Sequence, residues 1–339
     1  MAQGNKRKRR RLRNILILEV VIIILLLIGA KIYNSLGKIK KDNSMDNEIL
    51  QNEEVEVDEG YRNIVIFGVD SRQNALSKGT NSDTIIIASI NNKTKDIKLV
   101  SIYRDTYTNI SGVGFDKINA AYSRGGYSLA LSTINTNFDL DIKEYVTVNF
   151  QAVVNTIDML GGITLDITEE ELKYLNGYVR SLNKINGTDV PGLSKAGIQT
   201  VNGTQATAYA RIRYTSGGDY KRTERQRIVV GKIFDKVKAS DLPTVNALID
   251  EIFPKTLTNL STLDLLSLAK DVFSYNIVNQ TGFPFEPDAH TYKKISYVFP
   301  IDLQSNVTKL HEFLFDEAGF VPSQKVQDYS AAIETIRNE

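Results

Sequence analysis

The sequence predicts an α/β domain with a mixed β-sheet, preceded by one N-terminal transmembrane helix. Short apolar segments rich in β-branched residues alternate with segments of helical spacing, which is typical of layered α/β domains. Three strand candidates come first with no helix between them, so we expect them to run up, down and up. This order favours a mixed sheet over a fully parallel one.

The composition limits the chemistry that is available. The chain of 339 residues has no cysteine and only two histidines, His290 and His311. Disulfides, zinc–thiolate sites and thiol nucleophiles are thereby excluded, and a histidine-based triad or metal site is disfavoured. Seven of the 41 basic residues lie within residues 6–13, and the remaining 34 are outnumbered by 40 acidic residues. The chain as a whole is therefore not a basic nucleic-acid binder.

The N-terminal part predicts a membrane anchor. A basic tail, residues 1–14, precedes the apolar segment 15–34, whose single acid Glu19 lies near the predicted cytoplasmic end. Positive charges ahead of the span place the N-terminus in the cytoplasm and the rest outside the cell membrane. A cleaved signal peptide is the alternative, but no convincing A-x-A cleavage site follows. Residues 35–60 are polar and predict a linker between membrane and domain.

Charged residues lie at the ends of the first three predicted strands. These strands are residues 63–70, 83–90 and 97–102. In an up-down-up order, Asp70, Asp83 and Arg104 would all lie at one end of the sheet. The alternative is that each polar residue simply begins or ends a strand.

The rest of the chain predicts further helices and strands. A helix begins over 117–122, is broken at Arg124-Gly125-Gly126, and resumes over 127–138. The next expected elements are a strand at 145–150, a helix at 151–160 and a strand at 163–167. Residues 168–197 look least regular, although their apolar residues keep roughly helical spacing, and they could form a lid or a substrate-facing insertion. Beyond residue 238 the pattern is mainly helical, with helices at 243–253, 263–273 and 307–314, a strand at 295–300 and a frayed helix over the last twenty residues.

A stretch dense in arginine, residues 209–227, is the strongest candidate for a binding site. Residues 209–214 alternate like a strand, with Arg211 and Arg213 on one face, and a helix follows from residue 220. Arg222 and Arg225 continue two apolar ridges of that helix and are expected to aim into the same space as the strand arginines. The guanidinium group of an arginine can donate hydrogen bonds to two phosphate oxygens at once, so this cluster predicts a phosphate or pyrophosphate pocket. The alternative is a solvated basic segment paired with carboxylates.

A series of short motifs covers about residues 63–227. In order they are GVDSR, SDT, SIYRD, DKINAAYSRGG, GGI, VNGTQATAYARIRY and GDYKRTERQR. This order resembles the LytR-CpsA-Psr family. One departure is Tyr103, where the family typically has proline. The resemblance implies an α/β/α sandwich with an apolar lipid-binding pocket, over residues 61–320, with residues 321–339 as a C-terminal tail. It also implies a phosphotransferase that moves a glycopolymer, teichoic-acid-like or capsular, from a polyprenyl-pyrophosphate carrier to peptidoglycan.

The resemblance also implies roles for individual residues. Asp70 and Asp83 would hold a divalent metal, Mg²⁺ or Mn²⁺, and Arg104 would act in catalysis. Apart from the resemblance, an acceptor hydroxyl needs a base, and the place of Asp105 and Asp219 within these motifs makes them candidates. The residues expected to bind the pyrophosphate are Arg104, Lys117, Arg124, Arg211, Arg213, Arg222, Arg225 and Gln226.

Other functions remain open at this stage. The same site could serve a pyrophosphatase or a protein glycosyl-phosphotransferase. A membrane-bound regulator, or transcriptional attenuator, is a further alternative. The basic tail adjoins a membrane segment, where such charges set topology and contact membrane lipids, so no nucleic-acid partner is expected.

Overall fold

The computed structural model describes residues 48–56, 59–69, 76–77, 79–252 and 255–339. The predicted basic tail, the predicted membrane span and Asp70 lie outside these residues. Within the described part of the chain, no helix has the length and apolar character needed to cross a membrane.

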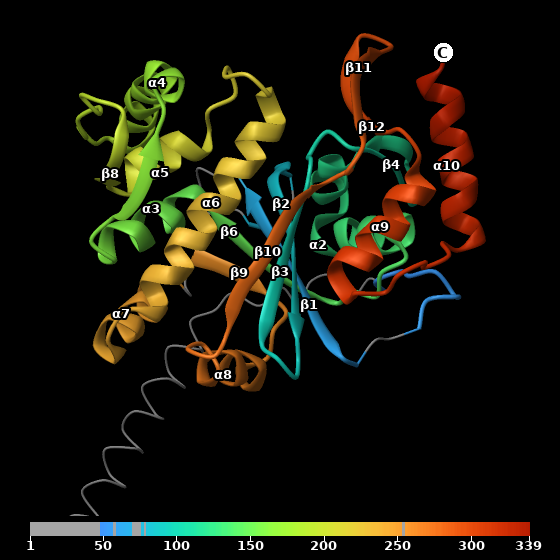
Figure 1. Cartoon of the computed structure of the whole chain (residues 1–339), viewed down its shortest axis with the longest axis horizontal. Coiled ribbons are helices and arrows are strands. Elements are labelled where there is room, and N and C mark those ends of the chain that lie inside the picture. Colours follow the sequence, from blue (N-terminus) through green and yellow to red (C-terminus); the bar gives the residue numbers. More distant parts are fainter. Residues whose placement is uncertain (1–47, 57–58, 70–75, 78, 253–254) are drawn as a thin grey trace, which may run out of the picture.

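A mixed six-stranded sheet forms the centre of the molecule (Figure 1). Its order is β10-β3-β2-β1-β6-β9, and β1 is antiparallel to β2, which is antiparallel to β3. The strands are β1 (Tyr61–Val69), β2 (Ser82–Asn91), β3 (Asp96–Ile102), β6 (Glu144–Asn149), β9 (Thr256–Thr258) and β10 (Asn276–Phe283). The predicted up-down-up order of the first three strands is confirmed, and β6 and β10 add the parallel pairs.

Both faces of the sheet are buried, which explains why its central strands are apolar throughout. Phe67, Ile85 and Ile87 belong to the core on one face, whereas Ile64 and Ile86 belong to the core on the other. Successive strand residues point to opposite faces, so a strand covered on both sides needs apolar residues at nearly every position.

The larger core packs under three helices and two hairpins. These elements are α2 (Ile118–Phe138), α9 (Leu303–Phe315), α10 (Gln324–Arg337), β4 (Tyr107–Ile110) with β5 (Gly114–Lys117), and β11 (Pro287–Tyr292) with β12 (Ile295–Pro300). The predicted break in α2 is confirmed as a kink at Gly125 and Gly126, where Gly126 has a φ of 65°. The predicted C-terminal helix is confirmed as α10, but it is packed on the domain instead of frayed, because its Val326 and Ile333 are buried in this core.

The opposite face of the sheet is covered by α6 (Gly218–Lys238) and α8 (Thr262–Lys270) (Figure 1). Val230 and Phe234 of α6 and Leu268 of α8 pack against the core on this face. α7 (Leu242–Ile252) follows α6 and contacts α3 (Phe150–Met159).

A third packed unit contains the region expected to be irregular. It comprises α3, β7 (Ile163–Ile167), α4 (Glu169–Asn186), β8 (Gly197–Val201) and α5 (Gly203–Ala210), with a core of their own. α4 is a regular helix that begins with a capping box between Thr168 and Glu171 and buries a stripe of Leu175, Val179 and Leu182. The helical spacing of the apolar residues is therefore confirmed over 169–186, and residues 187–196 lack a helix or strand.

The chain around the arginines and beyond α8 differs from the sequence prediction. Residues 209–214 do not form a strand, since α5 continues through Ala210 and Arg211 is its C-cap. α5 packs so closely on α3 that a Cβ at Gly203 would lie 2.1 Å from the carbonyl oxygen of Val154. Strands β9, β10 and β11 were not predicted, so the mainly helical character expected after residue 238 was only partly right. Helices α7, α8 and α9 and strand β12 match their predictions.

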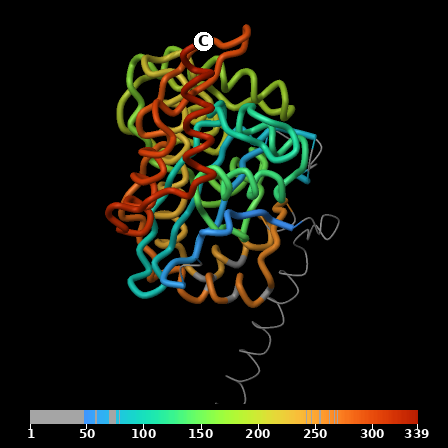
Figure 2. The backbone as a smooth tube through the Cα atoms, turned by 90° about the vertical axis from the view of Figure 1, so that its right-hand side faces the viewer, coloured from blue at the N-terminus to red at the C-terminus, as the bar shows by residue number. Residues whose placement is uncertain are grey.

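The segment 48–56 is packed on the domain rather than free of it. Asn52 is buried, and its Nδ2 donates to Asp139 Oδ1 at 2.6 Å and to the carbonyl oxygen of Thr136 at 3.0 Å. The Ser323 backbone N–H donates to Asp139 Oδ2 at 2.7 Å. The segment thus passes beneath the start of α10 (Figure 2). This part of the predicted linker belongs to the folded domain.

Candidate active site

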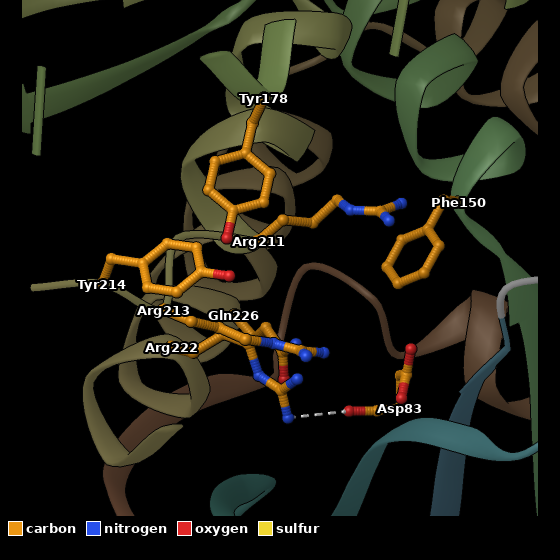
Figure 3. Close-up of a pocket in the computed structure, with 8 residues that line it drawn as sticks. All are labelled: Asp83, Phe150, Tyr178, Arg211, Arg213, Tyr214, Arg222 and Gln226. Atoms are coloured by element: carbon orange, nitrogen blue, oxygen red, sulfur yellow. Dashed lines mark hydrogen bonds between the residues drawn. The ribbon is translucent and has the colours of Figure 1, made fainter. Parts of the chain in front are cut away.

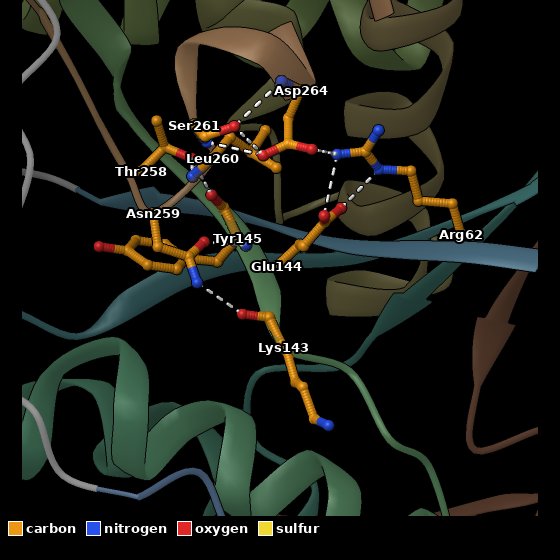
Figure 4. A network of polar contacts seen from close by, with 9 residues as sticks. All are labelled: Arg62, Lys143, Glu144, Tyr145, Thr258, Asn259, Leu260, Ser261 and Asp264. Carbon is orange, nitrogen blue, oxygen red and sulfur yellow. Dashed lines mark hydrogen bonds and ion pairs between the residues drawn. The ribbon is translucent and has the colours of Figure 1, made fainter. Parts of the chain in front are cut away.

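A cavity of about 240 Å³ opens beside the beginning of β2 (Figure 3). Its lining comes from β2, the first residue of α3, the middle of α4, the loop after α5 and the first turns of α6. The residues are Asp83, Phe150, Tyr178, Arg211, Arg213, Tyr214, Arg222 and Gln226. Five of the residues selected from the sequence, Asp83, Arg211, Arg213, Arg222 and Gln226, therefore meet in one place.

Asp83 and Arg104 form an ion pair at this end of the sheet. Arg104 Nη1 donates to Asp83 Oδ1 at 2.5 Å, and Arg104 Nε lies 3.7 Å from Asp105 Oδ2. Burial opposes the charge on Arg104, but the carboxylates of Asp83, Asp105 and Asp219 together raise its pKa. The guanidinium is therefore charged at neutral pH and holds Asp83 at the cavity wall.

Arg222 is the most buried cation of the cavity. Its residue exposure is 2%, and its Nη2 donates to Asp219 Oδ2 at 3.0 Å and to the backbone oxygen of Asp83 at 3.4 Å (Figure 3). Its Nε has no hydrogen-bond partner in the structure. Burial lowers its pKa to about 10, and the charges of Arg104 and Arg213 act in the same direction while Asp219 and Asp83 oppose them. An anion in the cavity would stabilise this incompletely balanced charge.

Arg211 and Arg213 approach the cavity from the loop after α5. The Arg211 guanidinium lies over the ring of Phe150, 5.1 Å from its centroid, which fixes the direction of the side chain. Arg213 has a half-exposed side chain, and its Nε lies 4.0 Å from Asp219 Oδ1. Asp219 thus stands between Arg213 and Arg222 and keeps two cations apart.

Arg225 does not point into the cavity. Its Nε donates to Glu171 Oε1 at 2.7 Å, its Nη1 to the carbonyl oxygen of Ile212 at 3.2 Å, and its Nη2 to Thr215 Oγ1 at 2.7 Å. The prediction that Arg225 aims into the space of Arg211 and Arg213 is therefore wrong. The ridge of α6 that carries Arg225 faces the third packed unit, whereas the ridge that carries Arg222 faces the sheet.

Three further predicted residues lie outside this cavity lining, namely Asp105, Lys117 and Arg124. Lys117 Nζ lies 3.0 Å from Asp105 Oδ1, so Asp105 bridges Lys117 and Arg104. Arg124 Nη2 bonds to Asp116 Oδ2 at 2.6 Å, and its side chain is half exposed. Asp83, Arg104, Asp105 and Lys117 thus form a chain of alternating charges, and Arg124 with Asp116 forms a separate ion pair.

Sequence reasoning missed three aromatic residues of the cavity, Phe150, Tyr178 and Tyr214. Phe150 and Tyr214 are the last residues of two segments predicted to be strands, 145–150 and 209–214, but nothing local shows which way an aromatic ring points. Tyr178 lies in the segment expected to be irregular, although its helical spacing was visible.

The described residues fit a divalent metal only in part. Asp83 supplies a carboxylate at the cavity, and oxygen ligands of this kind suit Mg²⁺. Its Oδ1 is engaged by Arg104, and Asp70 lies outside the described residues. No group of three or more potential His, Asp or Glu ligands occurs within the described ranges.

Comparisons with known proteins agree on one family. The model of the LytR_cpsA_psr family matches residues 26–312. The polyisoprenyl-teichoic acid–peptidoglycan teichoic acid transferase TagU of Enterococcus faecalis is 30% identical over 239 residues, which are 68% of this chain and 74% of that protein.

Solved structures show the same fold. TagT bound to LI-WTA superposes with a TM-score of 0.62 at 25% identity, covering 80% of this chain and 98% of that one. The LytR-CPS2A-psr family protein YwtF (TagT) with bound octaprenyl pyrophosphate lipid gives a TM-score of 0.59 at 23% identity, with the same coverage. With its fold, its arginine-lined cavity and a family match over most of its length, this chain belongs to the LytR_cpsA_psr family.

Proposed function

We propose that this chain transfers a glycopolymer from a polyprenyl-pyrophosphate carrier to peptidoglycan by phosphoryl transfer at the outer face of the cell membrane. One observation carries the proposal: Arg211, Arg213 and Arg222 line a single cavity together with Asp83. A pyrophosphate diester carries two negative charges, and a cavity with three guanidiniums supplies matching charge. The names of the teichoic acid transferases among the relatives support the same reaction.

The reaction needs little covalent chemistry from the protein. An acceptor hydroxyl oxygen attacks the glycan-bearing phosphorus and forms a new P–O bond. The bond from that phosphorus to the bridging oxygen breaks, and its electron pair leaves with the polyprenyl phosphate. The arginines stabilise the charge that moves onto the phosphate oxygens, which is the usual main contribution in phosphoryl transfer.

The hydroxyl proton needs an acceptor. Asp219 contacts both Arg213 and Arg222, so it lies beside the proposed phosphate position. Asp105 is tied to Arg104 and Lys117 instead. We therefore favour Asp219 over Asp105 as the base, while both remain candidates.

We further propose that Asp83, with Asp70, holds Mg²⁺ or Mn²⁺. When bound, the ion would neutralise part of the pyrophosphate charge and favour departure of the lipid phosphate. The polyprenyl chain would occupy an apolar pocket of the domain. The similarity to a fold with bound octaprenyl pyrophosphate supports this part of the proposal.

A transfer assay with the purified full chain in detergent tests the function. The donor is a polyprenyl-pyrophosphate disaccharide with a labelled sugar, and the acceptor is peptidoglycan, with and without Mg²⁺. We expect label on peptidoglycan and release of polyprenyl monophosphate, both dependent on Mg²⁺. Cleavage of the donor without labelled peptidoglycan would indicate a pyrophosphatase, and no cleavage would favour a regulator.

A further inference from the structure

Two tyrosines line the cavity beside the arginines, Tyr178 and Tyr214. Tyr178 comes from α4 and Tyr214 from the loop after α5, and their hydroxyl groups both point towards the arginines (Figure 3). Tyr214 has a relative exposure of 72%, so its ring stands at the mouth of the cavity instead of packing in a core. A large ring left exposed beside a binding cavity is available to contact a ligand.

The segment that carries Tyr214 is held in place from several sides. The backbone N–H of Ser216 donates to Glu170 Oε1 at 2.8 Å, and Thr215 Oγ1 accepts the bond from Arg225. The ring of Tyr214 lies 6.0 Å from that of Tyr174, one helical turn before Tyr178 on α4. The exposed ring is therefore presented by a fixed loop and is preorganised for binding.

The chemistry of the two tyrosines selects among the three parts of the donor. A pyrophosphate is recognised by cations, which the arginines already supply. A polyprenyl chain needs an enclosed apolar surface, whereas Tyr214 is open to solvent and carries a hydroxyl. A sugar ring has an apolar C–H face and hydroxyl edges, so it can lie on a tyrosine ring and bond to its hydroxyl.

We propose that Tyr178 and Tyr214 form a subsite for the saccharide attached directly to the pyrophosphate of the donor. This inference rests on the proposed function and adds the part of the substrate that the arginines leave unbound. The pyrophosphate would lie against Arg211, Arg213 and Arg222, and the first sugar would leave the cavity past the two rings.

Binding of two ligands to the full chain in detergent tests the subsite. One ligand is polyprenyl pyrophosphate without sugar, and the other carries a disaccharide on the same pyrophosphate. We expect Tyr214→Ala to weaken binding of the sugar-bearing ligand by about 3- to 10-fold and to leave the sugar-free ligand unchanged. Tyr214→Phe should retain most of the affinity, and Tyr178→Leu should act in the same sense as Tyr214→Ala.

Phe273→Ala serves as the matched control, because Phe273 is an exposed aromatic residue outside the cavity lining. It should alter neither affinity. An equal loss for both ligands in Tyr214→Ala would overturn the subsite, as would no loss for either. Unchanged donor binding with a raised KM for peptidoglycan would assign the rings to the acceptor instead. Failure of the unmodified chain to bind either ligand would reject the proposed function itself.

Discussion

Arg222 and Arg225 lie three residues apart on α6 and are almost equally buried, with exposures of 2% and 4%, but their surroundings differ. Arg225 has a hydrogen-bond acceptor for each guanidinium nitrogen, from Glu171, Ile212 and Thr215. Arg222 has an Nε without a partner, and burial lowers its pKa. A buried cation whose bonds are complete holds the fold together, whereas one left incomplete beside a cavity is available for a ligand.

The contacts of Arg225 also connect the parts of the cavity wall. Glu171 belongs to α4, which carries Tyr178, and Thr215 belongs to the loop that carries Arg213 and Tyr214. Arg225 is therefore a positioning residue that joins these segments to α6.

The largest expected effect is on stability, from Arg225→Met. The change leaves the Glu171 carboxylate buried without its cation, and breaking a buried pair in this way costs about 3–5 kcal/mol. Chemical denaturation of the full chain measures the free energy of unfolding. Adding Glu171→Gln should recover part of the loss, because the amide removes the unpaired charge. A stable Arg225→Met protein that fails to bind polyprenyl pyrophosphate would instead assign Arg225 to the ligand.

Arg222→Met should act mainly on turnover. Loss of one charged donor to the transferring phosphate should lower kcat about 10²- to 10³-fold, since such donors stabilise developing charge. The unfolding free energy should change by less than about 1 kcal/mol, because removing a buried and incompletely balanced charge offsets the loss of the hydrogen bonds that Arg222 makes. Transfer assays and denaturation of the same preparation separate the two effects.

Arg227→Met is the matched control for Arg222→Met. Arg227 is buried on the same helix, burial lowers its pKa, and its Nη1 lacks a partner, but it does not line the cavity. Turnover should therefore change less than about threefold. A loss as large as that of Arg222→Met would show that an incomplete bonding pattern matters more than position at the cavity.

Asp139→Asn tests a buried polar group that lies outside the cavity lining and has both carboxylate oxygens hydrogen-bonded. Asp139 has a φ of 51°, a conformation that asparagine tolerates, so the change affects mainly its bonds to Asn52 and Ser323. We expect a loss of about 1–3 kcal/mol in unfolding free energy with unchanged turnover. Asp316→Asn, at another left-handed helix end but with a surface ion pair, should cost less than about 1 kcal/mol. A fall in kcat for Asp139→Asn alone would connect the N-terminal segment to the active site.

Features that depend on local pattern were predictable from the sequence. The apolar runs of β1, β2 and β3 and their order placed Asp83 and Arg104 at one end of the sheet, and the structure joins them in an ion pair. The helical spacing of α6 also separated its two ridges correctly.

Features that depend on distant partners were not predictable. The direction of Arg225 is decided by Glu171, 54 positions earlier in the chain, in a segment that looked irregular. Strand β10 was missed because polar residues and a glycine interrupt its apolar residues, so it lacks an apolar alternation, and it is stabilised by parallel pairing with β3. Tyr178 and Tyr214 line the same cavity only after α4 and the loop after α5 have packed together.

The smallest expected effect is a pH dependence of stability at His311, a buried group outside the cavity lining. Burial lowers its pKa, and the Phe138 oxygen, Glu317 and Asp139 oppose this only in part. In the unfolded chain His311 has a pKa of about 6.5, so below that pH it binds a proton more readily than in the folded chain. Acid therefore lowers the free energy of unfolding, by at most about 1.4 kcal/mol per pH unit. His311→Gln should reduce the loss between pH 7 and pH 5 in denaturation experiments and leave turnover at pH 7 unchanged. An identical pH profile in both proteins would show that this histidine takes up its proton equally well in the folded chain, and that other groups govern the acid sensitivity.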